Sequence, residues 1–165
     1  MPRRIVSRLI LPALLIGLAL PAMARVDKIA GIDVTFDPSA VTNAAAAKRF
    51  THIADDLKNA IAGLVADRLG DEGARIGIDI SEVELSNSFT EATGAADTRL
   101  EGIVAITDAQ DNSNFAAYVL TVNIDQARGF LPETVDMTTL TASGDAYYQA
   151  MIMAFARSVV DRLDL

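Results

Sequence analysis

The sequence contains no cysteine and no tryptophan, and His52 is its only histidine. Without cysteine the chain forms no disulfide, has no thiolate ligand or nucleophile, and offers no residue for lipid attachment at a lipoprotein cleavage site. Any histidine-dependent catalysis has to use His52. A domain without disulfides depends on its hydrophobic core, and 51% of the residues are hydrophobic.

Basic residues are also scarce, since the chain has 14 lysines and arginines against 22 aspartates and glutamates. Three of the basic residues, Arg3, Arg4 and Arg8, lie at the very start. Without these three, 11 basic residues remain against 22 acidic ones, a net charge of −11. This balance disfavours binding to nucleic acid or to anionic lipid, both of which attract Lys and Arg. It predicts a solvated acidic surface.

The first 24 residues have the composition of a secretory signal peptide. A basic start precedes the uncharged stretch from Leu9 to Ala24, which proline and glycine interrupt and which is short for a spanning helix of about 20 residues. Ala22 and Ala24 form an A-x-A cleavage signal, so we expect cleavage between Ala24 and Arg25. The residues around Arg3 and Arg4 fit the twin-arginine pattern poorly, which favours general secretion.

The remaining residues, 25–165, are predicted to form a single domain because no linker, repeat or low-complexity tract divides them. Alternation of apolar and polar residues predicts a first strand over 30–36. A helix follows, starting at Asp37 and Pro38 or later at Thr42 or Asn43, and ending near Gly70. Its expected apolar stripe is Phe50, Ile53, Leu57, Ile61 and Leu64.

In the second half of the domain the sequence pattern predicts three strands and another helix. In the strand over 74–85 the apolar alternation slips by one residue, which predicts a bulge near Ser81. A loop over 86–97 leads to a hairpin of strands 98–107 and 115–124. Ser143 or Asp145 is the expected cap of the closing helix. The predicted apolar face of that helix is Tyr148, Ile152, Phe155, Val159 and Leu163.

These elements follow the order β-α-β-β-β-α, and both helices have one apolar side. The economical arrangement is an α+β two-layer sandwich, in which a mixed four-stranded sheet carries two helices on one face. The first strand and the strand over 74–85 are expected to be parallel, joined by a right-handed crossover through the helix.

Two local patterns invite a metal-binding interpretation, and neither is complete. In "DAQDNSN" the side chains of Asp108, Gln110, Asn112 and Asn114 alternate as in an EF-hand loop. Ser113 stands where that loop needs glycine and Val119 where it needs a bidentate glutamate, so turn chemistry is the better interpretation.

The second pattern, "HIADD", places His52, Asp55 and Asp56 on one helix face. They offer a weak metal site or a histidine oriented by a carboxylate, against an ordinary exposed helix face. Glu82 and Glu84 form an acid pair of the kind that glycosidases use, but more simply occupy the outer face of a bulged strand. Nucleotide-binding and serine-hydrolase motifs are absent.

One face of the predicted hairpin offers a better functional clue. If Thr107 pairs with Phe115, Ile103 lies opposite Val119 on the face without helices. Ile103, Phe115 and Val119 then form an apolar patch, which is typical of a partner-binding site. The alternative is that the aperiodic segment 126–144 folds over the patch as a lid.

The overall layout resembles small bacterial envelope modules of the TolB N-terminal and CsgG-like type. The segments that carry the resemblance are "ADDLKNAIAGLVADRLG", "LEGIVAITDAQDNSNFAAYVLTVNI" and "YYQAMIMAFARSVVDRL". It implies an accessory or binding role in the envelope, and it implies no catalytic residue. Many members of that group are lipoproteins, whereas this sequence lacks a lipidation cysteine.

We therefore expect a periplasmic, or else extracellular, protein without enzymatic activity, cofactor or metal. It is predicted to bind an envelope protein or a second copy of itself, to bind no nucleic acid, and to keep no stable membrane anchor after cleavage. The alternative is a small periplasmic hydrolase or metal-dependent enzyme that uses His52 with Asp55 or Asp56.

Overall fold

The computed structural model describes residues 26–39, 48, 50–84, 99–111, 115–134 and 145–163. In these residues the strands are β1 (Ile29–Phe36), β2 (Ala74–Glu84), β3 (Arg99–Asp108) and β4 (Ala116–Asn123). The helices are α2 (Ile53–Leu64), α4 (Ile124–Ala127) and α5 (Asp145–Asp161), and a 3-10 turn, η1 (Arg128–Phe130), follows α4. This order agrees with the predicted α+β class.

The four strands form one mixed sheet in the order β1-β2-β3-β4. β1 and β2 are parallel, and the other neighbours are antiparallel. The pairing of β2 with β3 shifts between Ile80 and Glu82, which confirms the bulge predicted near Ser81. Because the bulge moves the alternation by one residue, Val83 pairs with Leu100 while Ile80 pairs with Gly102.

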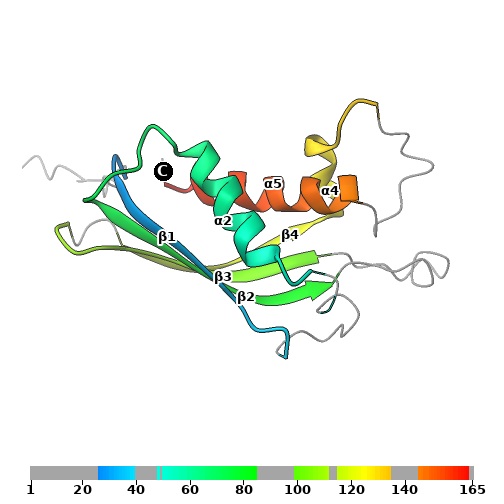
Figure 1. Ribbon diagram of the computed structural model, residues 1–165, viewed down its shortest axis with the longest axis horizontal. Coiled ribbons are helices and arrows are strands. Elements are labelled where there is room, and N and C mark those ends of the chain that lie inside the picture. The colour runs from blue at the N-terminus through cyan, green and yellow to red at the C-terminus, as the bar shows by residue number, and fades with distance from the viewer. Residues whose placement is uncertain are drawn as a thin grey trace, which may run out of the picture.

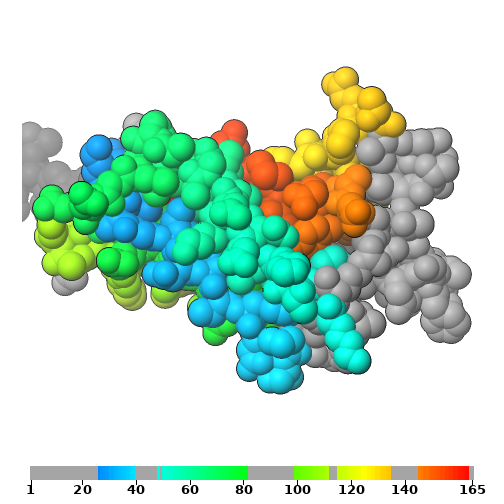
Figure 2. Space-filling view, viewed as in Figure 1, coloured from blue at the N-terminus to red at the C-terminus, as the bar shows by residue number. Residues whose placement is uncertain are grey.

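The two long helices lie on the same side of the sheet, as predicted (Figure 1). Figure 2 shows α2 between the blue segment of β1 and the orange-red α5. The inward residues of α2 are Ile53, Leu57 and Ile61, all fully buried. They belong to one hydrophobic core with the helix-facing isoleucines of β2, which are Ile76, Ile78 and Ile80.

The helix layer differs from the prediction in its number of helices. Between β4 and α5 the chain forms the one-turn α4, which makes three helices in the described part instead of two. A capping box creates this turn: the Asn123 side chain accepts from the Gln126 amide (3.1 Å), and the Gln126 side chain accepts from the Asn123 amide (2.9 Å). The spacing of Asn123 and Gln126 was a usable sequence signal for it.

One of the predicted starts of the first helix, at Asp37 and Pro38, is wrong. Pro38 and Ser39 form a turn, in which the Asp37 carboxylate accepts from the Ser39 amide at 2.8 Å and from the Ser39 hydroxyl at 2.6 Å. Asp37 closes this turn and caps no helix at Pro38, because a short carboxylate satisfies its own neighbouring backbone equally well. Thr42 and Asn43, the alternative caps, lie outside the described residues. At the other end α2 stops at Leu64, before Gly70.

The apolar face of α5 is wider than the predicted single stripe. Tyr147 is fully buried, whereas Tyr148, which was expected in the core, is half-buried. The broader face arises because α5 contacts α2 on one side, β3 and β4 below it, and α4 with η1 at its start. Ile152, Phe155, Val159 and Leu163 are buried as predicted.

Candidate functional site

The face of the sheet opposite the helices has no helix over it in the described part of the chain (Figure 1). We call this the open face. Alternation along each strand sends one set of side chains to the core and the other set to the open face. On β3 the open-face set includes Ile103, which is 49% exposed, and on β4 it includes Val119, which is 59% exposed.

The register of β3 and β4 brings these apolar side chains together. Ile103 pairs with Val119, and Ala105 pairs with Ala117, as the hairpin pattern predicted. Phe115, directly before β4, is 66% exposed. Ile103, Phe115 and Val119 therefore form an exposed cluster on the open face, which we call the open-face patch. Its role as a binding site stays a prediction.

The described part of the expected lid lies on the other side of the sheet. Residues 124–130 form α4 and η1, both of which contact α5 in the helix layer. Leu131 packs against the core, and Phe130 is 39% exposed. The rest of the segment, 135–144, lies outside the described residues. The first part of the 126–144 segment is thus no cover for the open-face patch.

The open face turns polar toward β1. Arg75 on β2 lies 4.0 Å from the Asp33 carboxylate on β1, and the Thr35 hydroxyl is 3.3 Å from Asp79. On the other half of the face the Thr121 hydroxyl donates to Glu101 over 2.7 Å. These groups place hydrogen-bonding side chains beside the open-face patch, toward β1 and around Glu101.

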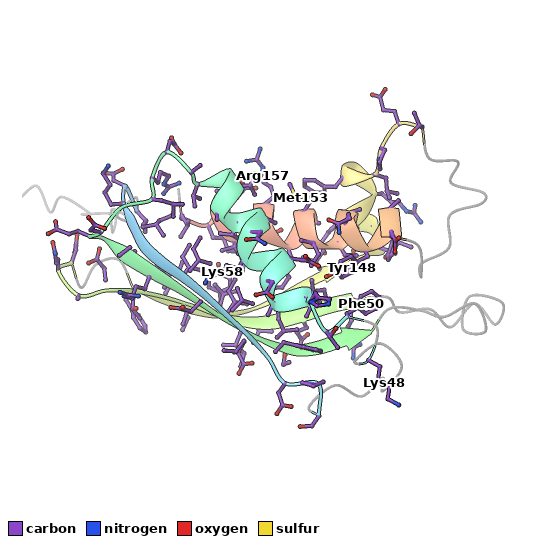
Figure 3. The ribbon with its side chains drawn as sticks, in the orientation of Figure 1. Lys48, Phe50, Lys58, Tyr148, Met153 and Arg157 are labelled. Atoms are coloured by element: carbon purple, nitrogen blue, oxygen red, sulfur yellow. The ribbon has the colours of Figure 1, made fainter. Side chains whose placement is uncertain are left out.

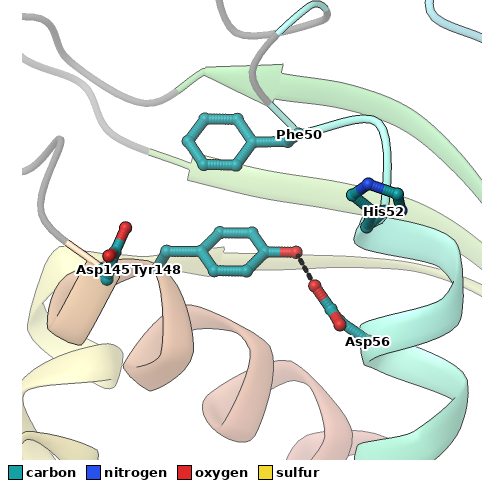
Figure 4. A pocket seen from close by; sticks show the side chains of 5 residues that line it. All are labelled: Phe50, His52, Asp56, Asp145 and Tyr148. Carbon is teal, nitrogen blue, oxygen red and sulfur yellow. Dashed lines mark hydrogen bonds between the residues drawn. The ribbon is translucent and has the colours of Figure 1, made fainter.

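A second feature is a shallow pocket of about 210 Å³ where the start of α2 meets the start of α5. Its lining residues are Phe50, His52, Asp56, Asp145 and Tyr148 (Figure 4). The rings of Phe50 and Tyr148 stack at 4.8 Å with 13° between their planes. Figure 3 shows the same two rings side by side at the beginning of α2.

A short polar contact in this pocket joins the two helices. The Tyr148 hydroxyl donates a hydrogen bond to the Asp56 carboxylate over 2.6 Å. Burial raises the pKa of Tyr148 well above its ordinary range, and the hydrogen bond to Asp56 and the negative charge of Asp56 raise it further. Tyr148 is therefore neutral at every physiological pH and acts as a donor.

The predicted group of His52, Asp55 and Asp56 is only partly assembled. His52 and Asp56 line the same pocket, but Asp55 is exposed and is not among its lining residues. Among the described residues no ion pair joins His52 to either carboxylate, and no three His, Asp or Glu side chains are grouped as metal ligands. Asp56 instead bonds Tyr148, 92 positions away, a contact that no local pattern predicts.

The loop after β3 follows turn chemistry. The Asp108 carboxylate accepts from the amides of Gln110 (2.9 Å) and Asp111 (3.2 Å). A carboxylate that accepts from the backbone amides two and three residues further on is the Asx pattern expected of a hairpin loop. Asn112 and Asn114 lie outside the described residues.

Other predicted residues fall outside the described part of the chain. The leader and its cleavage residues, Ala22, Ala24 and Arg25, belong to this group. The side chains of Glu82 and Glu84 do too. Within the part that the structure does describe, no helix has both the length and the apolar character needed to cross a membrane.

No protein-family model and no curated protein matches the chain. Ten chains in solved structures match this one, and they include two different proteins. One is the PelC dodecamer from Paraburkholderia phytofirmans, with a TM-score of 0.49 and 9% identity over 88% of this chain and 94% of that one. The other is protein XCC0632 from Xanthomonas campestris, of family DUF330, with a TM-score of 0.47 and 12% identity over 88% and 86%.

These neighbours correct the resemblance drawn from the sequence. PelC and a DUF330 protein are among the structures similar to this chain, and the likeness to TolB N-terminal and CsgG-like modules is wrong. The segments that carried it record the order of strands and helices, which unrelated families share. At 9% and 12% identity the new likeness concerns the fold alone and assigns no function to any residue.

Proposed function

We propose that this chain is an exported accessory protein of the bacterial envelope that has no catalytic activity and binds another envelope protein through the open-face patch. The observation that carries the proposal is the exposure of Ile103, Phe115 and Val119 at 49%, 66% and 59% on the open face. Contiguous apolar side chains left in water are costly, and on monomeric proteins such patches usually mark binding sites.

The geometry of the patch supports a protein partner. Ile103 and Val119 are directly paired across two strands, so their positions are held by the sheet and little side-chain freedom is lost on binding. Ala105 and Ala117, the next pair, keep the surface between them flat. A flat apolar centre with the polar rim of Arg75, Asp79 and Glu101 is the composition of a protein interface.

The leader and the charge support the envelope as the compartment. A basic start and the A-x-A signal at Ala22 and Ala24 direct export, and cleavage before Arg25 releases a chain of net charge −11 from 11 basic and 22 acidic residues. Protein sequencing of the chain recovered from a periplasmic fraction tests this part. An amino terminus at Arg25 supports it, and a chain that keeps residues 1–24 contradicts it.

Site-specific photocrosslinking tests the binding site. A photoreactive amino acid replaces Val119 in one strain and Lys58, on the exposed side of α2, in another. We expect one envelope protein to crosslink to position 119 and not to position 58. A photoreactive group at position 103 should crosslink to the same envelope protein. Adding Val119→Asp to that chain should reduce the crosslink from position 103 at least tenfold, because a buried unpaired carboxylate opposes binding.

The matched control is Asn123→Asp, which adds the same charge to the same strand and face. Asp replaces Asn well as a helix cap, so the bond to the amide of Gln126 is retained. This variant should crosslink like the parent chain. Equal crosslinking from positions 119 and 58, or none from either, overturns the proposal.

One observation favours a second candidate function, a small hydrolase or metal-dependent enzyme. His52 and Asp56 do line a common pocket. Against it, the carboxylate that should orient His52 is bonded to Tyr148. A hydrolytic activity that His52→Ala abolishes, or a metal ion bound stoichiometrically and lost in the same variant, would establish this function instead.

A further inference from the structure

β4 is an edge strand whose outer side has no backbone partner among the described residues. It pairs with β3 along its inner side, and the sheet ends there. In an antiparallel edge strand alternate residues direct their amide and carbonyl groups outward, which gives about four outward-facing residues in a strand of this length. Unpaired backbone of this kind is a template for another strand.

The composition of β4 leaves this edge unprotected. Its sequence, AAYVLTVN, contains no charged residue and no proline, and its pairing with β3 has no bulge. Each of the other three strands contains at least one charged residue. Proteins usually block an edge with lysine, proline or a bulge, and β4 has none of these devices. The absence is notable in a chain with 22 acidic residues.

The opposite edge of the sheet is partly occupied. At the start of β1 the Ile29 amide donates to the Arg68 carbonyl, and the Ile29 carbonyl accepts from the Gly70 amide. Asp33 adds an exposed charge farther along β1. The β1 edge is thus partly blocked at its start, whereas the outer side of β4 has no backbone partner among the described residues. Association through one self-complementary edge forms a closed two-fold dimer and not a filament.

We propose that two copies of this chain associate through their β4 edges, antiparallel and about a two-fold axis, to form one continuous eight-stranded sheet. A second copy fits because it brings a strand of equal length that is also uncharged, so two acidic molecules meet where neither carries charge. The two-fold axis stands perpendicular to the sheet, and the helices of both copies share one face.

The alternation of side chains restricts the register. Opposed residues in an antiparallel pair point to the same face, so an open-face residue has to meet an open-face residue. The centre of Ala116–Asn123 then falls on Val119 or Leu120. Leu120 is already buried, with only 4% of its surface exposed, whereas Val119 is 59% exposed. A register that pairs Val119 with Val119 of the second copy therefore removes far more apolar surface from water than one that pairs Leu120 with Leu120.

This association also joins the two open-face patches. In the dimer the open face carries, in order across the axis, Ile103 and Val119 of one copy and then Val119 and Ile103 of the other. The proposed partner would then meet a surface twice as wide. Dimer formation itself needs no partner, so the two proposals fail separately.

Cysteine crosslinking tests the edge, because the native chain has no cysteine to interfere. Under mild oxidation we expect Val119→Cys to form a disulfide-linked dimer, since the two side chains lie on adjacent strands. Ile103→Cys should give at least tenfold less disulfide-linked dimer. Its two copies lie three strand spacings apart, roughly 14 Å, beyond the Cβ separation of about 4 Å that a disulfide requires.

Lys58→Cys, on the exposed side of α2, measures collisional crosslinking. Equal crosslinking from positions 103 and 119 indicates that the open faces pack on each other, and it overturns the edge dimer. Crosslinking at 119 no greater than at 58 overturns it too. A disulfide formed only when Val119→Cys is mixed with Thr121→Cys retains edge pairing and overturns the Val119 register in favour of Leu120.

Sedimentation equilibrium separates the dimer from partner binding. The parent chain should have twice the monomer mass, Val119→Asp should be monomeric because two carboxylates would face each other at the axis, and Val119→Thr should remain dimeric. Ile103→Asp should remain dimeric while losing the partner crosslink, because Ile103 lies one strand inward. A monomeric parent chain at concentrations up to about 100 μM, well above ordinary dimer dissociation constants, overturns the proposal.

Discussion

The Tyr148 hydroxyl lies 2.6 Å from the Asp56 carboxylate and thereby connects the first turn of α5 to the first turn of α2. The two residues are 92 positions apart. The ring of Tyr148 also stacks on Phe50, three residues before α2 begins. This relationship holds the two long helices in a single arrangement over the sheet.

The bond between Tyr148 and Asp56 should make a measurable contribution to stability. We expect a coupling free energy of about 1–2 kcal/mol between Tyr148→Phe and Asp56→Ala, because the acceptor is charged and partly shielded from water. Urea denaturation of both single variants and the double variant measures it. The exposed pair Arg157–Asp161, at 3.9 Å, is the control and should give less than about 0.5 kcal/mol. Additive effects at both pairs would contradict the expectation.

The raised pKa of Tyr148 predicts a loss of stability in alkali. The tyrosine ionises in the unfolded chain near its ordinary pKa of 10.0 but stays neutral in the fold, where burial and then Asp56 oppose the phenolate. Its contribution is therefore complete below the unfolded pKa and declines as the pH rises above it. Tyr148→Phe has no ionisable hydroxyl at this position. The urea concentration at the midpoint of its unfolding should therefore fall less between about pH 8 and pH 11 than that of the parent chain. Parallel curves for the two chains argue against it.

Gly102 allows α5 to approach the sheet closely. A Cβ at this position would lie 3.0 Å from the Asp79 carbonyl oxygen and 3.3 Å from the Phe155 ring. We expect Gly102→Ala to lower the free energy of unfolding by about 1–3 kcal/mol through overpacking. Gly77→Ala is the control, because a Cβ there meets only the Ala105 carbonyl at 3.8 Å. Equal effects at the two glycines, measured by thermal unfolding, contradict this assignment.

Two further glycines should respond to alanine in opposite directions. Gly73 has a φ of +117°, and its Cβ would lie 2.4 Å from the Lys28 carbonyl oxygen, so Gly73→Ala should cost at least about 1–3 kcal/mol. Gly63 lies on the exposed side of α2 with nothing within 4 Å of its Cβ position. Gly63→Ala should add up to about 1 kcal/mol through helix propensity. A lower melting temperature for Gly63→Ala would refute the second part.

Local patterns predicted the sheet well because its order depends on alternation along each strand. The strand bounds agree with the structure to within one or two residues, and the slip at Ser81 correctly indicated the bulge. The register of Ile103 with Val119 followed from the hairpin alone. The helix ends were less predictable, since Asp37 bonds Ser39 in a turn with the same chemistry that would cap a helix.

The sequence by itself determined the α+β class, the pairing of β3 with β4 and the position of Ile103, Phe115 and Val119 on the face without helices. These features depend on the period of two in a strand and on residues close together in the chain. Only the tertiary structure decided how wide the buried face of α5 is, with Tyr147 fully buried and Tyr148 half-buried. It also decided that Asp56 bonds Tyr148 and that β4 is an edge strand of the sheet that the described residues form. Such contacts join segments far apart in the chain, and packing of the whole domain selects them.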